Sequence, residues 1–327
     1  MPLGEAAAVL NAVFWAATGV AAKTLGPAVR PYHIITAHTL VASAVFIVVA
    51  AVTGNIDELA KAPAAALLLF SAAALLNTVG SFIFFTAVSA GSVGGTYTTT
   101  TGIYVLLSLL AGWVFFDEPV APLALLGAAG IMAGVYLLNG PGRISSVRTA
   151  GTAPAVGKLG PPSSPHAATS SGARERIGGW IGRRKARLFT GLGLGAATAV
   201  LWTLGLLVLK WGLERSDVIT AAFMRNVVAS AVYVGIGLAA RWTIVPRAGR
   251  SDWSRLLLSA GFFAGSVFLW NYALANTAAG KTAVLASIAP VFALLMAVGF
   301  LHERLSRLAV LGAAVAVGGT LLVVVAK

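Results

Sequence analysis

The sequence predicts an all-α integral membrane protein with ten transmembrane helices arranged as two inverted five-helix repeats. Two observations lead to this fold class. The chain is 58% hydrophobic and only 10% charged, with a mean hydropathy of +0.89, and its two halves share sequence at a nearly constant spacing. A soluble domain carries about 25% charged residues, so this chain has too little charge to cover a water-exposed surface. The bilayer is therefore the expected solvent.

Each expected span is a mostly apolar stretch of about 20 residues, the length that crosses a hydrocarbon core about 30 Å thick. Very short turns join several neighbouring stretches, which must then form antiparallel hairpins. The ten stretches are 6–25, 34–52, 64–88, 93–116, 119–138, 188–211, 218–240, 253–277, 281–301 and 306–326.

The chain divides into a first repeat at 1–139, a linker at 140–187 and a second repeat at 188–327. The linker holds a Pro/Gly/Ser-rich stretch followed by a basic run that ends at Arg187. This composition buries too little apolar surface to offset the entropy of ordering, which predicts a flexible segment. A regulatory or partner-binding role for the linker stays open.

Self-comparison identifies the repeat. The string WVFFDEPVAPLALLGAAGIMAG at 113–134 and the string VGFLHERLSRLAVLGAAVAVGG at 298–319 are identical at nine of 22 positions. The string VASAV occurs at 41–45 and again at 228–232. The same offset of 187 residues pairs Trp15 with Trp202, Lys23 with Lys210, and His38 with Arg225.

Five helices per repeat is an odd number, so the second repeat must enter the membrane in the opposite orientation to the first. Many secondary transporters obtain alternating access from such inverted repeats, which rock around a site at the membrane midplane. The loops support inversion, because they differ in charge. The segment between spans two and three carries Asp57, Glu58 and Lys61, whereas its counterpart carries Arg241, Arg247, Arg250 and Arg255. The positive-inside rule favours termini on the outside.

Composition also excludes several classes of protein. The chain has no cysteine, which excludes disulfides and thiolate metal sites, and its four histidines form no metal-ligand pattern. We expect no catalytic residues, metal or cofactor. The net charge of +13 lies mostly between apolar segments, where topology and anionic lipid account for it better than nucleic acid does. No basic residue precedes the first apolar run, which favours a retained span over a cleaved signal peptide.

Short motifs in a fixed order resemble the drug/metabolite transporter superfamily, and within it the ten-helix EamA-type family. The motifs are the strings from Glu118 to Gly127 and from Glu303 to Gly312, Tyr272 with the Ala-Leu-Ala after it, Pro290-Val291, the two paired tryptophans and Arg225. The sequence departs from that family in its long linker and in having no Pro-Val in the fourth span, where Thr101-Gly-Ile-Tyr104 stands instead.

The resemblance implies a multi-pass transporter in the inner or plasma membrane, not an enzyme, that moves a small polar metabolite and often exports amino acids. Its expected partners are a small-molecule substrate and the lipid bilayer, as a monomer or homodimer. Three alternatives stay open: an anion or phosphate-ester antiporter, a flippase for a lipid-linked substrate, and a membrane scaffold that acts through the linker.

Arg225 lies about eight residues into its span, at a depth of about 12 Å. A charge there costs about 2.5–3.5 kcal/mol, so it should face the bundle or a wet cavity. It either contacts an anionic substrate or makes structural hydrogen bonds. His38, its repeat counterpart, is either a packed neutral histidine or a proton carrier. Lys23 and Lys210 end equivalent spans, where they either reach the headgroups or line the path with positive charge.

The fourth span begins with a run of threonines, and the glycines on either side of this run would ease local unwinding of the helix. Asn11 lies one turn from Trp15, which suits one amphipathic helix face. The candidate substrate path is Arg225, His38, Lys23, Lys210, Trp15, Trp202, Asn11, Tyr97, Thr101, Tyr104, Asn226, Asn271 and Tyr272.

Other residues have structural interpretations. Glu118 and Glu303 flank turns, where each is expected to cap the helix that follows it. Six glycines are expected to allow close helix packing, namely Gly127, Gly130, Gly134, Gly312, Gly318 and Gly319. No Asp or Glu lies in the middle of a predicted span, although Glu5 stands near the first one. A carboxylate proton relay is therefore not expected.

Overall fold

The computed structural model describes residues 3–26, 28–90, 93–139, 193–301 and 307–326, and within these ranges all regular structure is α-helical. The predicted linker at 140–187 lies outside the described residues, as do Glu303 and the side chain of Tyr97.

The first half of the chain forms α1 (Leu3–Lys23), α2 (Pro31–Val52), α3 (Ile56–Lys61), α4 (Ala64–Ala90), α5 (Val93–Phe116) and α6 (Pro122–Asn139). The second half begins with the helix Gly193–Leu213. It continues with α8 (Val218–Ala239), α9 (Arg250–Asn276), α10 (Ala279–Ala286), α11 (Ala289–Leu301) and α12 (Arg307–Val325).

Eight stretches of the described chain are long and apolar enough to cross a bilayer, with α10 and α11 counted as one stretch. The apolar parts of α6 and α12 are shorter. Large apolar side chains face outward, as lipid contact requires, with Val48 59%, Leu68 71% and Phe300 76% exposed. A helical, multi-pass membrane protein is thus confirmed, whereas the count of ten spans and their inverted arrangement stay predictions.

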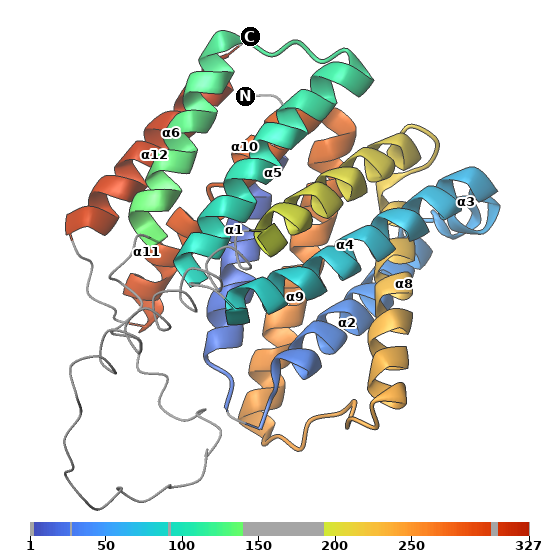
Figure 1. Ribbon diagram of the computed structural model, residues 1–327. Coiled ribbons are helices and arrows are strands. Elements are labelled where there is room, and N and C mark those ends of the chain that lie inside the picture. The colour runs from blue at the N-terminus through green and yellow to red at the C-terminus, as the bar shows by residue number, and fades with distance from the viewer. Residues whose placement is uncertain (1–2, 27, 91–92, 140–192, 302–306, 327) are drawn as a thin grey trace, which may run out of the picture.

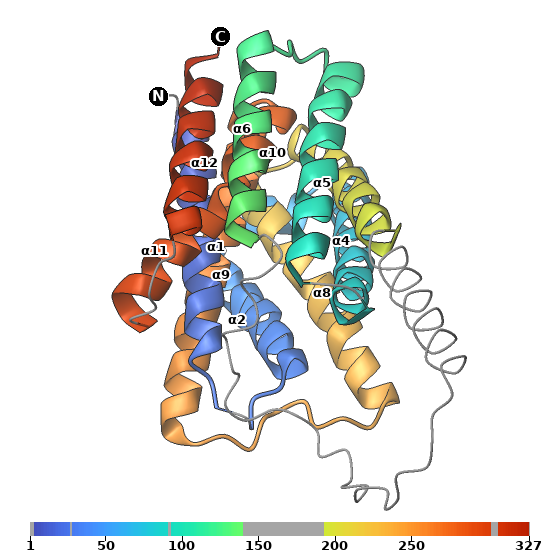
Figure 2. The ribbon, with the colours of Figure 1, turned by 60° about the vertical axis from the view of Figure 1, so that its left-hand side comes forward.

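Helices from opposite halves of the sequence lie against one another. α6 packs along α12, α1 along α9, α2 along α8, and α5 on α10; Figure 1 shows the green α6 beside the red α12. The helix Gly193–Leu213 packs on α4, where the Trp202 ring contacts Gly80. The start of α1 and the end of α12 lie at one end of the bundle (Figures 1 and 2), which is called the terminus end below.

Glycines bring α6 and α12 into backbone contact. A Cβ added at Gly127 would lie 2.5 Å from the carbonyl oxygen of Gly319, and one added at Gly134 would lie 2.5 Å from that of Gly312. In lipid, no hydrophobic effect draws helices together, and van der Waals packing holds them instead. Small residues allow the close contact that this packing needs. The packing prediction is confirmed for these four glycines and is wrong for Gly318, where an added Cβ would meet nothing within 4 Å.

The predicted ninth span is broken, because α10 ends at Ala286 and α11 begins at Ala289. Pro290 explains the break, since its ring would clash with the carbonyl four residues earlier and it has no N–H to donate. Sequence reasoning expected unwinding in the fourth span instead, but α5 is continuous from Val93 to Phe116. The short helix α3, between α2 and α4, was not predicted.

The α6–α12 contact predicts opposite effects for two alanine substitutions. Gly134→Ala places a methyl group against the backbone of α12, and overpacking of this kind costs about 1–3 kcal/mol. Gly318→Ala is the matched control, because its Cβ enters open space and alanine favours a helix by about 1 kcal/mol over glycine. Thermal unfolding in detergent should show a lower Tm for Gly134→Ala and an unchanged or higher Tm for Gly318→Ala. Equal loss in both would contradict close contact at Gly134.

Candidate functional site

Arg225, in the middle of α8, turns its guanidinium toward α9. Its Nη1 donates a hydrogen bond of 2.7 Å to Oδ1 of Asn271. Asn271 is fully buried, and its Nδ2 has no hydrogen-bond partner within the described residues. The Nε of Arg225 is also buried without a partner there. The structure therefore brings two of the candidate path residues together and leaves donors of both unused.

A cluster of aromatic residues lies on the Tyr104 side of this pair. The Tyr104 side chain lies near the Arg225 guanidinium, and its ring meets Trp202 edge-on with centroids 6.2 Å apart. Trp202 also lies 5.4 Å from the ring of Phe84. Met224 and Trp270, the chain neighbours of Arg225 and Asn271, pack against the same cluster as Tyr104. Tyr104 on α5 thus lies near the guanidinium, and Trp202 on the helix Gly193–Leu213 packs against Tyr104.

His38 occupies a separate place. Its Nε2 lies 2.9 Å from Oγ of Ser259, and its ring stacks on Phe263 at 5.0 Å. Ser259 lies 12 residues before Asn271 on α9, a distance of about 18 Å along that helix. The ring is 7% exposed. Of the two interpretations of His38, these contacts agree with a packed histidine. They do not place His38 beside Arg225.

Three further candidates have satisfied or packed side chains. Asn11 donates from Nδ2 to the carbonyl oxygen of Ser266 at 2.7 Å and to its Oγ at 2.9 Å, which ties α1 to α9. Asn226 bonds back to Ala222 in its own helix at 2.7 Å. Tyr272 stacks on Phe268 with centroids 6.1 Å apart. These contacts give each side chain a structural role.

The remaining candidates differ in exposure. Trp15 is 54% exposed and touches Phe263, although its repeat counterpart Trp202 is only partly exposed. Lys23 is exposed at the end of α1, and Thr101 is partly buried on α5. The side chain of Tyr97 lies outside the described part of the chain.

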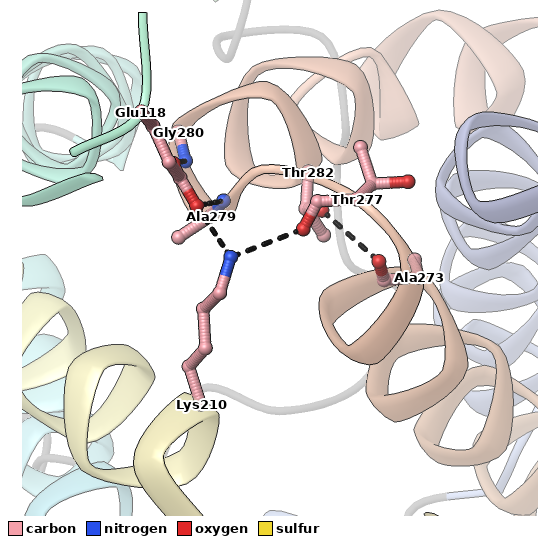
Figure 3. Close-up of polar contacts among 7 residues, drawn as sticks. All are labelled: Glu118, Lys210, Ala273, Thr277, Ala279, Gly280 and Thr282. Carbon is pink, nitrogen blue, oxygen red and sulfur yellow. Dashed lines mark hydrogen bonds and ion pairs between the residues drawn. The ribbon is translucent and has the colours of Figure 1, made fainter. Parts of the chain in front are cut away.

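A second polar arrangement lies at the terminus end, where α10 begins (Figure 3). Glu118, in the loop between α5 and α6, accepts hydrogen bonds from the backbone N–H of Ala279 at 2.7 Å and of Gly280 at 3.3 Å. It also forms an ion pair with Lys210, whose Nζ donates to the carbonyl oxygen of Thr277 at 3.2 Å. The two side chains are only 11% and 15% exposed. A carboxylate at a helix start satisfies free N–H groups and the positive end of the helix dipole.

The expectation that Glu118 caps the helix after it is therefore wrong. The following helix is α6, but the carboxylate reaches the start of α10 in the other half of the sequence. Lys210 does not reach for the headgroups either, because Glu118 holds its ammonium group. The repeat aligned lysine with lysine and glutamate with glutamate, but it gave no signal for which carboxylate meets which ammonium group.

A second ion pair at the same end was missed altogether. Glu5, at the start of α1, contacts Nζ of Lys281 on α10 at 2.6 Å. The same Nζ donates to the carbonyl oxygen of Ala326 after α12 at 3.1 Å. Both ion pairs join the first half of the sequence to the second, and both involve the first turn of α10 or the turn before it. The name terminus-side junction is used below for Glu118, Lys210, Glu5 and Lys281.

Comparison with known proteins assigns this fold to a class. A family model described as the EamA-like transporter family matches residues 2–140 and 189–325. One solved crystal structure of another protein is 16% identical and superposes with a TM-score of 0.73 over 99% of each chain, which shows a shared fold. These matches define a multi-pass membrane transporter. The chain belongs to the EamA-like transporter family.

A curated relative from Streptantibioticus cattleyicolor is named "Probable terminal-alkyne amino-acid exporter". It is 33% identical to this chain over 131 residues, which is 39% of this chain and 43% of the relative. The chain thus matches less than half of the length of that relative.

The terminus-side junction predicts that Glu118 has two separable roles. Removing one partner of a buried ion pair costs about 3–5 kcal/mol, and losing a helix cap costs about 1 kcal/mol more. Glu118→Gln keeps an acceptor for the Ala279 N–H but loses the charge, whereas Glu118→Ala loses both. We expect the Tm in detergent to fall in the order wild type, Glu118→Gln, Glu118→Ala.

The charge-swap double variant, Glu118→Lys with Lys210→Glu, is the control for the cap. A lysine at 118 has no acceptor for the backbone N–H groups of Ala279 and Gly280, so the swap should restore little of the lost Tm. Full recovery in the double variant would show that the ion pair alone matters and that the cap contributes nothing.

Proposed function

We propose that the chain is an exporter in the cell membrane that moves a small polar metabolite, such as an amino acid, by alternating access between two inverted five-helix repeats. The observation that supports the proposal is the pattern of helix packing, because the main helix pairs have counterparts when the two halves are exchanged. Ten spans follow if the shorter helices α6 and α12 are added to the eight longer stretches.

The exchange can be followed pair by pair. Exchange replaces α1 by the helix Gly193–Leu213 and α9 by α4. The pair α1–α9 therefore becomes the pair of the helix Gly193–Leu213 with α4, and both pairs are in contact. Exchange likewise converts α2–α9 into α8–α4, and both occur. The pairs α2–α8, α5–α10 and α6–α12 are each converted into themselves. A two-fold relation between the halves accounts for all of these contacts.

Hydrogen bonds between helices support the same relation. Asn11 on α1 donates to the carbonyl oxygen of Ser266 on α9. Thr198 stands 187 residues after Asn11, and it donates at 3.4 Å to the carbonyl oxygen of Gly80 on α4. Gly80 stands 186 residues before Ser266. Equivalent positions thus make equivalent contacts despite different side chains.

Inversion follows from the odd number of helices in each half, and alternating access follows from inversion. Two repeats of opposite orientation can exchange conformations, so that a site near the midplane opens first to one side and then to the other. Arg225 lies two turns into α8, and Tyr104 on α5, in the other half, lies near it. The site proposed for the substrate is this pair with Asn271 and Trp202.

The terminus-side junction has a clear place in this mechanism. Both of its ion pairs connect the first half to the second, so the halves cannot separate at the terminus end while the pairs persist. We expect the described conformation to be closed at that end. Export then requires both pairs to break, and they re-form when the opposite end opens.

The amino-acid substrate class rests on the relative from Streptantibioticus cattleyicolor, which is named as a probable amino-acid exporter. The partly buried cation Arg225 suits such a substrate, because a guanidinium binds a carboxylate through two hydrogen bonds.

Flux measurements test the proposal. The full-length protein, reconstituted in liposomes, should exchange at least one labelled amino acid from a panel that also contains nucleosides and phosphate esters. Strong inhibition by phosphate esters would favour the antiporter, and transport of lipid-linked substrates alone would favour the flippase. Deleting residues 145–180 should leave flux largely intact, whereas a scaffold would depend on them. No flux for any class from correctly folded protein contradicts the proposal.

A further inference from the structure

The Arg225 guanidinium has no charged partner among the residues that the structure describes. The ion pairs there join Lys210 to Glu118, Lys281 to Glu5, and arginines outside the bundle centre to neighbouring acids. Arg225 instead donates to a neutral amide oxygen at 2.7 Å. A buried cation in a lipid-embedded bundle is stable only when its charge is paired or solvated. The site therefore lacks one negative charge.

The unused atoms at this site are donors. Nε of Arg225 carries one N–H and Nδ2 of Asn271 carries two, and neither nitrogen has a partner in the described part of the chain. The orientation of the Asn271 amide is fixed, because a guanidinium only donates and so requires the amide oxygen to face it. Asn271 is completely buried, so bulk water does not satisfy its Nδ2. Both nitrogens therefore need a hydrogen-bond acceptor, which a bound ligand can supply.

α5 contributes a further buried polar side chain close to this region. Ser108 is completely buried. It lies one helical turn from Tyr104, on the same face of α5, and Tyr104 lies near Arg225. A ligand that bound Arg225 and Asn271 from the second half would therefore lie beside α5 of the first half.

We propose that Arg225 and Asn271 form a subsite for the single carboxylate of the substrate, and this proposal rests on the transport function proposed above. One carboxylate oxygen accepts from the Nε–H of Arg225, and the other accepts from Nδ2 of Asn271. The remainder of the substrate lies against Tyr104 and Trp202. The subsite neutralises the guanidinium and satisfies both unused donors at once.

Charge balance favours a carboxylate over a phosphate ester. A phosphate monoester carries nearly two negative charges at neutral pH, whereas Arg225 supplies only one positive charge. Lys210 and Lys281 do not add to it, because Glu118 and Glu5 already neutralise them. A monoanion leaves the site neutral, and a dianion would leave a buried negative charge uncompensated.

Thermal unfolding of the full-length protein in detergent tests the subsite with defined probes. Each proteinogenic amino acid is compared with its carboxamide and with its aminophosphonate analogue. At least one amino acid should raise the Tm, and its amide should not. The Arg225→Gln variant should lose this response, with apparent affinity reduced at least about tenfold, as expected when a charge-assisted hydrogen bond is removed. An equal response to acid and amide, or no response to any acid, overturns the proposal.

A second pair of variants tests the missing charge without any ligand. Asn271→Asp places a carboxylate beside Arg225, so it should unfold at a higher temperature than Asn271→Leu and should no longer respond to amino acids. Equal Tm values for the two variants overturn the subsite, because the site then gains nothing from an anion.

Flux in liposomes separates this proposal from the transport function. Wild-type flux of a substrate without a carboxylate, unchanged in Arg225→Gln, would overturn the subsite and leave transport standing. An acid-specific rise in Tm without flux of any compound would support the subsite and overturn transport.

Discussion

The hydrocarbon core of the bilayer offers no hydrogen bonds, and this constraint governs how the bundle is built. Every polar group at membrane depth must find its partner inside the protein. Hydroxyl and amide side chains of this chain largely do so, by bonding back to their own helix, as Asn226 does to Ala222, or by crossing to a neighbour, as Asn11 does to Ser266. Six buried side-chain atoms of the described residues lack a partner, and two of them, the donors of Arg225 and Asn271, lie on side chains that bond to each other. A polar group left unsatisfied in such a setting points to a ligand.

The same constraint explains how α10 can begin inside the bundle. A helix start exposes backbone N–H groups that lipid cannot satisfy. Here the Glu118 carboxylate accepts two of them, and Lys210 balances its charge while bonding to Thr277 (Figure 3). The result is a contact between the two halves that is stable when complete. A state in which only one of the charged groups has its partner is unfavourable. Such a contact suits a device that alternates between two defined states.

Sequence reasoning recovered the fold because the signal for a membrane helix is the apolar length, which is local. The same reasoning placed Arg225 and Asn271 among the candidates, since a buried cation is conspicuous among apolar residues. It missed the pairing of Glu118 with α10 and of Glu5 with Lys281 because these contacts join residues far apart in the chain. Residues at equivalent positions of the two repeats also have different surroundings. Trp15 is 54% exposed while Trp202 packs on Phe84 and Tyr104, and His38 bonds to Ser259 while Arg225 bonds to Asn271.

Alternating access requires the two halves to separate at the terminus end during each transport cycle. A reversible cross-link between the halves tests this separation most directly. The chain has no cysteine of its own, and a Cβ at Gly4 of α1 would lie 2.0 Å from Oγ1 of Thr277, at the α9–α10 turn. Gly4→Cys with Thr277→Cys therefore places two thiols within reach of each other across the halves, once the α9–α10 turn shifts to admit the new Cβ, which would otherwise lie 2.8 Å from the carbonyl oxygen of Asn276. Oxidation should stop amino-acid flux and reduction should restore it, while each single variant is unaffected by the oxidant. Full flux from fully cross-linked protein would contradict alternating access at this end.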